Sequence, residues 1–324
     1  KSRNDGVISG ISPYVLPCIA AAWVLMYLCL KGGAKSLAKA AEFTVVIPVA
    51  MLAVMAVRGL MYSNRGEAIA ALFTPDFSAL TKPDFWLSAL GQVFFSLSVG
   101  VGIMPAYGAY LPKNTNIFSC SLVIAAADFF VSLLSSLVLF TTLYGCGLQG
   151  EICDSGIITA FVVYPAAITR LFGANTVLNA VAGVLFYGSL TMLAVQSAVS
   201  MAEAFISPFC DKFKIKKKSF VRVFCIAGLI LSVVFATSAA PLIVEISDKF
   251  INFYHVLILG VFECIIIGFS GKTRGLTDEI NRYSGRLKIR AASFERAVKY
   301  LSPVILSCVT LTELVRLIVF GSGY

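Results

Sequence analysis

A carboxylate inside an apolar stretch is the side chain of this sequence best suited to ion or proton chemistry. Asp128 follows three Ala and precedes two Phe, and the same stretch contains no basic residue. Such a group is costly in hydrocarbon, so it either binds a cation or takes up a proton because of desolvation. We favour an ion or proton role for Asp128 over that of a hydrogen-bonded structural residue.

A second candidate is the segment Phe94-Phe95-Ser96-Leu97-Ser98-Val99-Gly100-Val101-Gly102, where Ser and Gly interrupt an apolar run. Each Gly costs a helix about 1 kcal/mol relative to Ala. If the helix breaks here, its freed carbonyl and amide groups can coordinate ions or substrates. Small residues also favour close packing between helices. The composition leaves both interpretations open.

Polar side chains recur at helical spacing in a third apolar run, at Gln196, Ser200 and Glu203. This spacing places them on one face of a helix. Hydroxyl and amide oxygens suit a hard cation such as sodium. Hydrogen bonds between helices explain the same pattern equally well.

Eight apolar segments position these residues. Of the 324 residues 58% are hydrophobic and 13% are charged, whereas soluble domains carry about 25% charged residues. The composition excludes a soluble domain, a disordered chain and a coiled coil. We expect an all-α, polytopic membrane protein, with helices rather than irregular backbone in the bilayer. Its spans lie near 12–31, 42–62, 86–111, 117–143, 177–209, 220–240, 251–269 and 300–320.

The basic residues predict how these spans are oriented. Alternate loops, starting after the first span, hold 18 of the 26 Lys and Arg, and the positive-inside rule makes that side cytoplasmic. The charge of +9 therefore indicates basic loops rather than nucleic-acid binding. Two long connections, 63–85 and 144–176, then face outward.

The outward loop 144–176 has features of its own. Its apolar stretch 157–171 is short and is interrupted by Pro165, so we expect a re-entrant or surface helix. Cys146 and Cys153 lie in the same loop. They either form a disulfide or remain two free thiols, and the sequence leaves both possibilities open.

Enzyme signatures do not occur in the sequence. It contains no GxSxG, GxxxxGK[ST] or HExxH motif. The single His, His255, cannot build a His-based metal site or a credible Ser-His-Asp set. We therefore predict that the protein is not an enzyme.

Several segments together resemble one known family. The segment WLSALGQVFFSLSVGVG, Trp86 to Gly102, is similar to the sixth helix of the neurotransmitter:sodium symporters. Other segments resemble the stretch before that helix, the eighth helix, the start of the tenth, and the loop and start of the eleventh: Phe73–Phe77, Ala194–Phe213, Asp248–Asn252, Asp278–Arg282 and Tyr300–Pro303. The resemblance covers nearly the whole chain and is closest in Trp86 to Gly102.

The resemblance implies a broken-helix transporter fold built from two inverted repeats. The eight spans correspond to the family's helices four to eleven, and its first three helices have no counterpart here. We expect those three helices on the same or another chain. Residues 1–62 then end the first repeat, 63–270 form the second, and 271–324 form a cytoplasmic loop and the last helix.

The resemblance also implies two sodium sites. Ser96 and Asp128 stand at positions of the first, where a Thr hydroxyl and an Asn side chain are usual. Gln196, Ser197 and the carbonyl of Leu193 stand at the second, where Thr or Asp is usual in place of Gln196. Asp128 therefore adds a full negative charge beside the expected cation.

A chloride-like site is implied by Gln92, Ser96 and Ser132, which resemble the chloride-binding side chains of chloride-dependent members. Chloride-independent members carry a carboxylate at the position of Ser132. In this chain the carboxylate of Asp128 lies one helical turn earlier. Our hypothesis is that Asp128 supplies the compensating charge, so that chloride is not required. The coupling ion that the resemblance implies is Na⁺.

Substrate and gate positions follow from the same resemblance. Ser98, Val101, Ser197 and Met201 match positions that line the substrate pocket, and Phe95 matches the aromatic lid of the outer gate. Val101 stands where bulkier residues often occur, which favours a medium or large apolar amino acid.

Two further carboxylates match gate positions. Asp248 resembles the acidic partner of the outer gate's Arg, and Asp211 resembles that of the inner gate's Arg. Both of those Arg residues would lie in or just before the first of the helices without a counterpart.

The function implied by the resemblance is sodium-coupled symport of an amino acid across the cell membrane by alternating access. The expected partners are the amino acid and membrane lipid, and no nucleic acid. Two alternatives stay open. The chain is a non-transporting truncated remnant, or it is a proton-coupled permease with Asp128 as the proton carrier.

Overall fold

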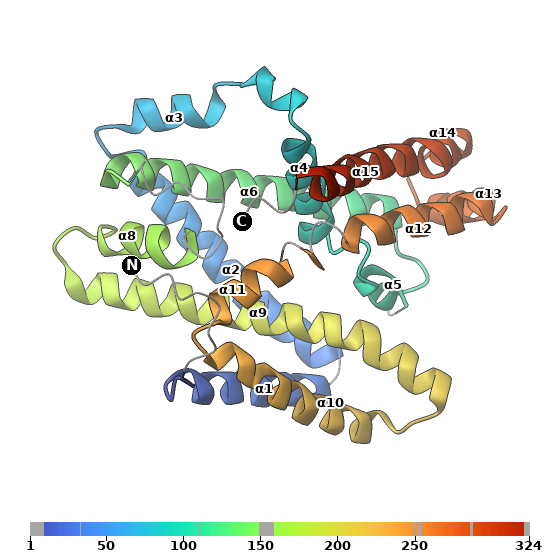
Figure 1. Cartoon of the computed structure of the whole chain (residues 1–324), viewed down its shortest axis with the longest axis horizontal. Helices are drawn as coiled ribbons and strands as arrows, with labels where there is room; N and C mark the ends of the chain where they lie inside the picture. Colours follow the sequence, from blue (N-terminus) through green and yellow to red (C-terminus); the bar gives the residue numbers. More distant parts are fainter. Residues whose placement is uncertain are drawn as a thin grey trace. The chain divides into compact units, whose positions relative to one another are not determined.

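The computed structural model is almost entirely helical in the residues that it describes (Figure 1). The described residues are 10–32, 34–109, 111–148, 159–248, 250–251, 255–285 and 288–320, with side chains left undescribed at 32, 34–44, 245, 313, 316, 317, 319 and 320. Within these ranges β-type pairing is limited to one antiparallel bridge, between Ile11 and Thr237. The predicted all-α class is confirmed.

The chain divides into two compact units, and the division falls inside its two longest helices. These are α6 (Ile117–Cys146) and α9 (Thr176–Phe213). The first unit comprises Lys1–Lys31, Phe77–Ala125 and Val199–Tyr324, and the second comprises Gly32–Asp76 and Ala126–Ala198. The predicted boundaries of the inverted repeats, at residues 62 and 270, remain a prediction.

The first unit packs around α4 and α12. Its elements are α1 (Val15–Gly32), η1 (Phe77–Thr81), α4 (Pro83–Ser96), α5 (Ile103–Gly108), α10 (Lys217–Ser232), η4 (Val233–Ala236), α11 (Ala240–Asp248), α12 (Val256–Phe269), α13 (Thr273–Arg282), α14 (Ala291–Arg296), η6 (Ala297–Leu301) and α15 (Ser302–Phe320), with the ends of α6 and α9. Leu87, Leu257 and Leu306 form a buried cluster that joins α4, α12 and α15. Gly260 lets the ring of Phe94 approach α12, because a Cβ there would lie 2.6 Å from Phe94 Cε1.

The second unit has its own apolar core. Its elements are α2 (Ala34–Gly59), α3 (Arg65–Phe73), the π-helical turn η3 (Thr159–Val163), α8 (Tyr164–Thr169) and the adjoining parts of α6 and α9. Met55, Val138, Ile168 and Phe186 belong to one buried cluster. The stretch expected to be a re-entrant or surface helix is thus a short helix packed on protein. Pro165 lies in the first turn of α8, where a missing amide is tolerated.

Membrane-spanning length is reached by only part of the described helices. Three of them are long and apolar enough to cross a bilayer: Ile117–Cys146, Thr176–Phe213 and Lys217–Ala236. A fourth results if α12 and α13 count as one span, although they meet at 94°. The bend lies at Gly271, whose φ of 71° is left-handed. The other predicted spans coincide with shorter or interrupted apolar helices.

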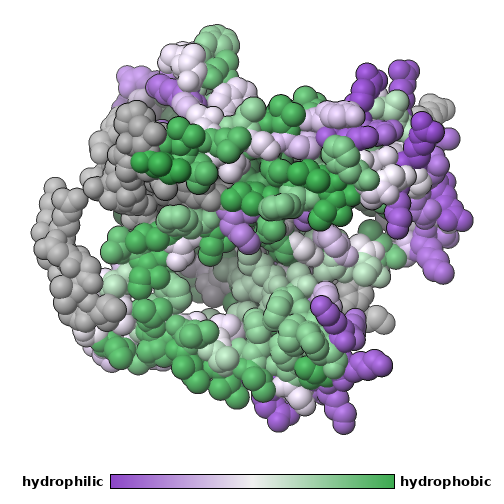
Figure 2. Space-filling model, turned by 45° about the vertical axis from the view of Figure 1, so that its right-hand side comes forward, coloured by the Kyte–Doolittle hydropathy of each residue, from purple (hydrophilic) through white to green (hydrophobic). Residues whose placement is uncertain are grey.

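The helix surfaces are apolar as well as the cores. Figure 2 shows hydrophobic side chains over much of the visible face. On α10, Val223, Ile230 and Leu231 are 65%, 65% and 75% exposed. Soluble proteins rarely expose large contiguous apolar patches, whereas a lipid-facing helix requires them. This surface agrees with the polytopic membrane class.

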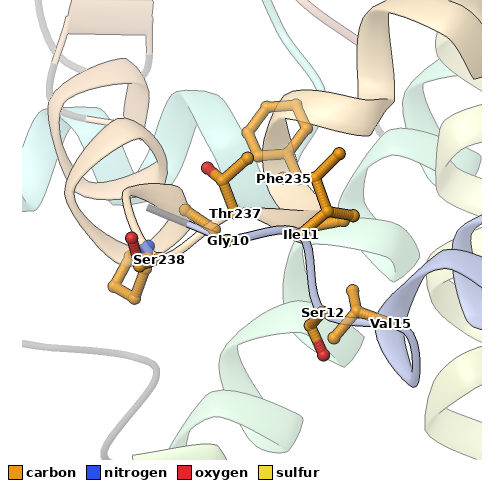
Figure 3. Close-up of a pocket in the computed structure, with 10 residues that line it drawn as sticks. Gly10, Ile11, Ser12, Val15, Phe235, Thr237 and Ser238 are labelled. Carbon is orange, nitrogen blue, oxygen red and sulfur yellow. The ribbon is translucent and has the colours of Figure 1, made fainter. Parts of the chain in front are cut away.

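The first described residues form backbone hydrogen bonds with the connection between η4 and α11. The amide of Ser12 donates to the carbonyl of Ala236 at 2.8 Å, next to the Ile11–Thr237 bridge. A pocket with a volume of about 530 Å³ lies beside this contact (Figure 3). The residues that line it are different from every site residue predicted from the sequence.

Helices α1 and α10 meet through one aromatic side chain. The ring of Trp23 lies against Gly228, where a Cβ would be only 2.0 Å from Trp23 Cη2. Trp23 Nε1 donates to Ser232 Oγ at 3.0 Å, and Phe224 packs edge-on at 6.2 Å between ring centroids. The position of the ring is therefore fixed from several sides, and Gly228 leaves the space for it.

We predict that Gly228→Ala destabilises the protein, although Ala is the better helix former by about 1 kcal/mol. The added methyl group must displace the held Trp23 ring, and such overpacking costs about 1–3 kcal/mol. Thermal unfolding of the purified protein in detergent measures the effect. The matched control is Gly188→Ala in α9, where a Cβ meets nothing within 4 Å. A fall in midpoint for Gly228→Ala alone is expected, and equal shifts would contradict this packing.

Candidate functional site

The apolar run of α4 is interrupted between Ser96 and Ile103. Helix α4 ends at Ser96 and α5 begins at Ile103. Three residues between them have left-handed backbone, namely Ser98, Gly100 and Gly102, with φ of 54°, 76° and 74°. Such a conformation costs a residue with a side chain about 1–2 kcal/mol, so it marks Ser98 as a strained position. Of the two interpretations of this segment, the broken helix is present.

The last turn of α4 closes with its own hydrogen bonds. The amide of Val99 donates to the carbonyl of Phe94 at 2.9 Å, and the amide of Ser98 to that of Phe95 at 3.2 Å. Gly100 is buried, with Val256 O 3.3 Å from where its Cβ would be. In the described part of the chain the amide of Gly100 donates no backbone hydrogen bond. The break thus leaves peptide groups between two helix ends outside the regular hydrogen-bond pattern of a helix.

Several predicted site residues follow the course of α4 and the break. Ser96 is half-buried at the last turn, and its Oγ lies 3.5 Å from the carbonyl oxygen of Val93. Phe95 is 55% exposed. Ser98 and Val101 lie in the break itself, both half-buried, and Gln92 is exposed on α4 one turn before Ser96. These five belong to the first unit.

Asp128 and Ser132 lie in the second unit, four residues apart on α6 and therefore on one face. The side chain of Asp128 is half-buried, and that of Ser132 is exposed. The hypothesis that the charge of Asp128 acts one turn from the position of Ser132 stays a prediction.

Helix α9 carries the remaining predicted ligands without a break. Leu193 and Gln196 are half-buried and Ser197 is exposed, all in the part that belongs to the second unit. Met201 and Asp211 are exposed further along the same helix, in the first unit. The predicted sodium and substrate residues are therefore divided between the two units.

Two of the three polar residues predicted to share one face of α9, Ser200 and Glu203, bind other side chains. The hydroxyl groups of Ser200 and Tyr107 are hydrogen-bonded, which links α9 to α5. Glu203 is 6% exposed and forms an ion pair with Lys217 at the start of α10. Ser207 Oγ donates to Glu203 Oε1 at 2.9 Å. Of the two interpretations of this spacing, hydrogen bonding between helices therefore accounts for Ser200 and Glu203.

Tyr107 is a residue that sequence reasoning missed. It lies in α5, directly after the break, and its partner Ser200 is distant in sequence. The only local signal is a hydroxyl-bearing aromatic residue in the short apolar helix that follows the two Gly. Through this bond the segment after the break is attached to the helix that carries Ser197.

Two other predicted features have simpler outcomes. Asp248 is exposed at the end of α11. Cys146 ends α6, whereas Cys153 lies outside the described residues, so the disulfide stays a prediction.

The donor set fits a sodium ion in its chemistry. The candidate ligands offer only oxygen atoms: the hydroxyl groups of Ser96 and Ser197, the carboxylate of Asp128, the amide oxygen of Gln196 and the carbonyl of Leu193. Hard cations prefer oxygen ligands.

Known proteins resemble the chain over nearly its full length. A sequence model described as the sodium:neurotransmitter symporter family matches residues 7–321. An uncharacterized sodium-dependent transporter of Methanocaldococcus jannaschii is 30% identical over 322 residues, which are 98% of this chain and 64% of that protein. The human sodium- and chloride-dependent creatine transporter 1 is 27% identical over 264 residues, which are 78% of this chain and 41% of that protein.

A solved structure shares the fold. The crystal structure of MhsT in complex with L-phenylalanine superposes with a TM-score of 0.78 at 22% identity, covering 90% of this chain and 66% of MhsT. The chain therefore spans slightly less than two thirds of the archaeal relative and of MhsT, and under half of the creatine transporter. The apolar helices and these matches identify an integral membrane protein with the fold of a transporter. The chain belongs to the sodium:neurotransmitter symporter family.

Proposed function

We propose that the chain is part of a sodium-coupled symporter that moves an apolar amino acid across the cell membrane by alternating access. The family and the sodium-dependent relatives support the choice of sodium. In this mechanism the ion gradient drives uptake because ion and substrate stabilise the same conformations of the protein. No covalent chemistry is involved.

The single observation that carries the proposal is the break between α4 and α5. In a membrane, irregular backbone is tolerated only where it is buried in protein or lines a water-filled cavity. In broken-helix transporters the peptide groups of such backbone coordinate ions and substrate near the middle of the membrane. The left-handed Ser98, Gly100 and Gly102 hold this chain in that form.

The proposed roles of the residues are as follows. Ser96 and Asp128 supply oxygen ligands for one sodium ion, and Leu193, Gln196 and Ser197 supply them for a second. Ser98, Val101, Ser197 and Met201 line the amino acid pocket, with Phe95 as its lid and with Asp211 and Asp248 at the two gates. The helices without a counterpart here complete both sites, on the same or another chain.

An apolar amino acid is the proposed substrate class. Val101 leaves more room than a bulkier residue would, and Met201 and Phe95 add apolar side chains to the proposed pocket. MhsT was solved with L-phenylalanine, which makes this amino acid a suitable first substrate to measure.

We predict that the full-length protein in proteoliposomes takes up labelled L-phenylalanine when an inward sodium gradient is imposed, and not when potassium replaces sodium. Ser197→Ala removes one ligand. If that ligand contributes about 1.4 kcal/mol, the variant needs about tenfold more sodium for half-maximal uptake. Ser121→Ala, on an exposed face of α6, is the control and should behave as the wild type. Uptake that follows a pH gradient without sodium would contradict the proposal, and so would its absence under both gradients.

We predict that Asp128 decides whether transport needs chloride. Replacing chloride by gluconate should leave wild-type uptake unchanged, because the carboxylate already supplies the compensating charge. In Asp128→Asn that charge is missing, so uptake should become chloride-dependent. Asp278→Asn, an exposed change of the same kind on α13, serves as the control. Chloride-dependent uptake by the wild type, unchanged in Asp128→Asn, would refute this role.

A further inference from the structure

An apolar groove with one basic residue runs between α1 and α10, within the first unit. Its volume is about 240 Å³. It is lined on α1 by Trp23, Val24 and Tyr27, and on α10 by Arg222, Ile226 and Leu229. None of these residues takes part in the proposed transport sites, so the groove needs another explanation.

The walls of the groove are fixed, and its apolar rim is open. Trp23 is held by its contact with Gly228 and by the hydrogen bond to Ser232. Val24 and Ile226 are 57% and 55% exposed, one on each helix. The apolar groove between the two helices is therefore preformed and faces outward from the unit.

Positive charge is concentrated at one end of this groove. The last turn of α9, the connection to α10 and the first turns of α10 contain six basic residues: Lys212, Lys214, Lys216, Lys217, Lys218 and Arg222. Lys217 is paired with Glu203. Arg222 is exposed, and no carboxylate among the described side chains forms an ion pair with it. Asp211 is the nearest acidic residue in the sequence, so the net charge here is strongly positive.

The position of Arg222 along α10 suits a membrane interface. The segment Lys217–Ala236 is long and apolar enough to span a bilayer, and Arg222 comes five residues after its start, about 7.5 Å along the helix axis. At this depth an Arg side chain reaches the headgroup region while its stem stays in hydrocarbon. The apolar part of the groove then continues toward the bilayer centre.

We propose that this groove binds one anionic phospholipid. An acyl chain lies along Val24, Ile226 and Leu229, and the phosphate is bound by Arg222, with the Tyr27 hydroxyl as a further donor in the lining. Clusters of basic residues at the cytoplasmic end of a span attract anionic lipids.

Native mass spectrometry of the full-length protein, released from detergent, tests the site. The probes are phosphatidylglycerol and phosphatidylcholine with identical acyl chains. We expect the wild type to retain phosphatidylglycerol preferentially, and Arg222→Gln to lower its occupancy about fivefold. The matched control is Arg274→Gln, which removes the same charge from an exposed position on α13 and should leave the occupancy unchanged. Equal losses in both variants, or no preference between the lipids, would overturn the proposal.

A second variant separates a lipid site from a simple anion site. Ala20 also lines the groove, and Ala20→Phe should block the acyl chain while Arg222 stays in place. We expect this variant to lose phosphatidylglycerol as Arg222→Gln does, with its elution in gel filtration unchanged. If inorganic phosphate competes with the lipid, or if Ala20→Phe binds lipid normally, Arg222 binds anions alone and the proposal fails. The proposal also fails if another segment of the full-length protein covers the groove and no lipid binds.

Discussion

Hydrocarbon offers a peptide group no hydrogen-bond partner, and the rest of this structure depends on that constraint. A chain in lipid must be helical wherever it lies against acyl chains. Irregular backbone survives only beside protein, water or bound ions. The break between Ser96 and Ile103 is such a place, because Ser98, Gly100 and Gly102 cannot continue a right-handed helix with positive φ. Gly100 is covered by Val256 of α12, which gives the break its protein support.

Close approach of helices is the second requirement, and Gly provides it at several contacts. Gly228 admits the ring of Trp23, Gly260 admits the ring of Phe94, and Gly268 lies so near Lys299 that a Cβ would be 2.9 Å from its Cα. Between helices in lipid the hydrophobic effect contributes little, so association relies on such packing and on polar contacts. The ion pair of the buried Glu203 with the partly exposed Lys217 joins α9 to α10 in this second way. Removing one partner of such a pair leaves an uncompensated charge.

Hydropathy predicted the helical class and the approximate position of the longer apolar helices among the described residues, because an apolar composition is a local signal. It missed the short helix α11. The break could not be decided in the same way, since Gly and Ser serve both kinked backbone and close packing. The spacing of Gln196, Ser200 and Glu203 correctly predicted that they lie on one face of a helix. It did not predict which groups this face contacts. Ser200 meets Tyr107, which is 93 residues away in sequence, and Glu203 meets Lys217, 14 residues away. A local sequence pattern cannot predict contacts between residues that are far apart in the sequence.

Sodium binding by the full-length protein is the central claim, and equilibrium stability measures it most directly. Thermal unfolding would be compared in sodium chloride and potassium chloride at equal ionic strength. A ligand at 100 times its Kd stabilises the folded state by about 2.7 kcal/mol, so sodium should raise the midpoint. A variant that combines Ser96→Ala and Ser197→Ala should lose this increase. The same midpoint in both salts, or an increase that the double variant retains, would contradict the account.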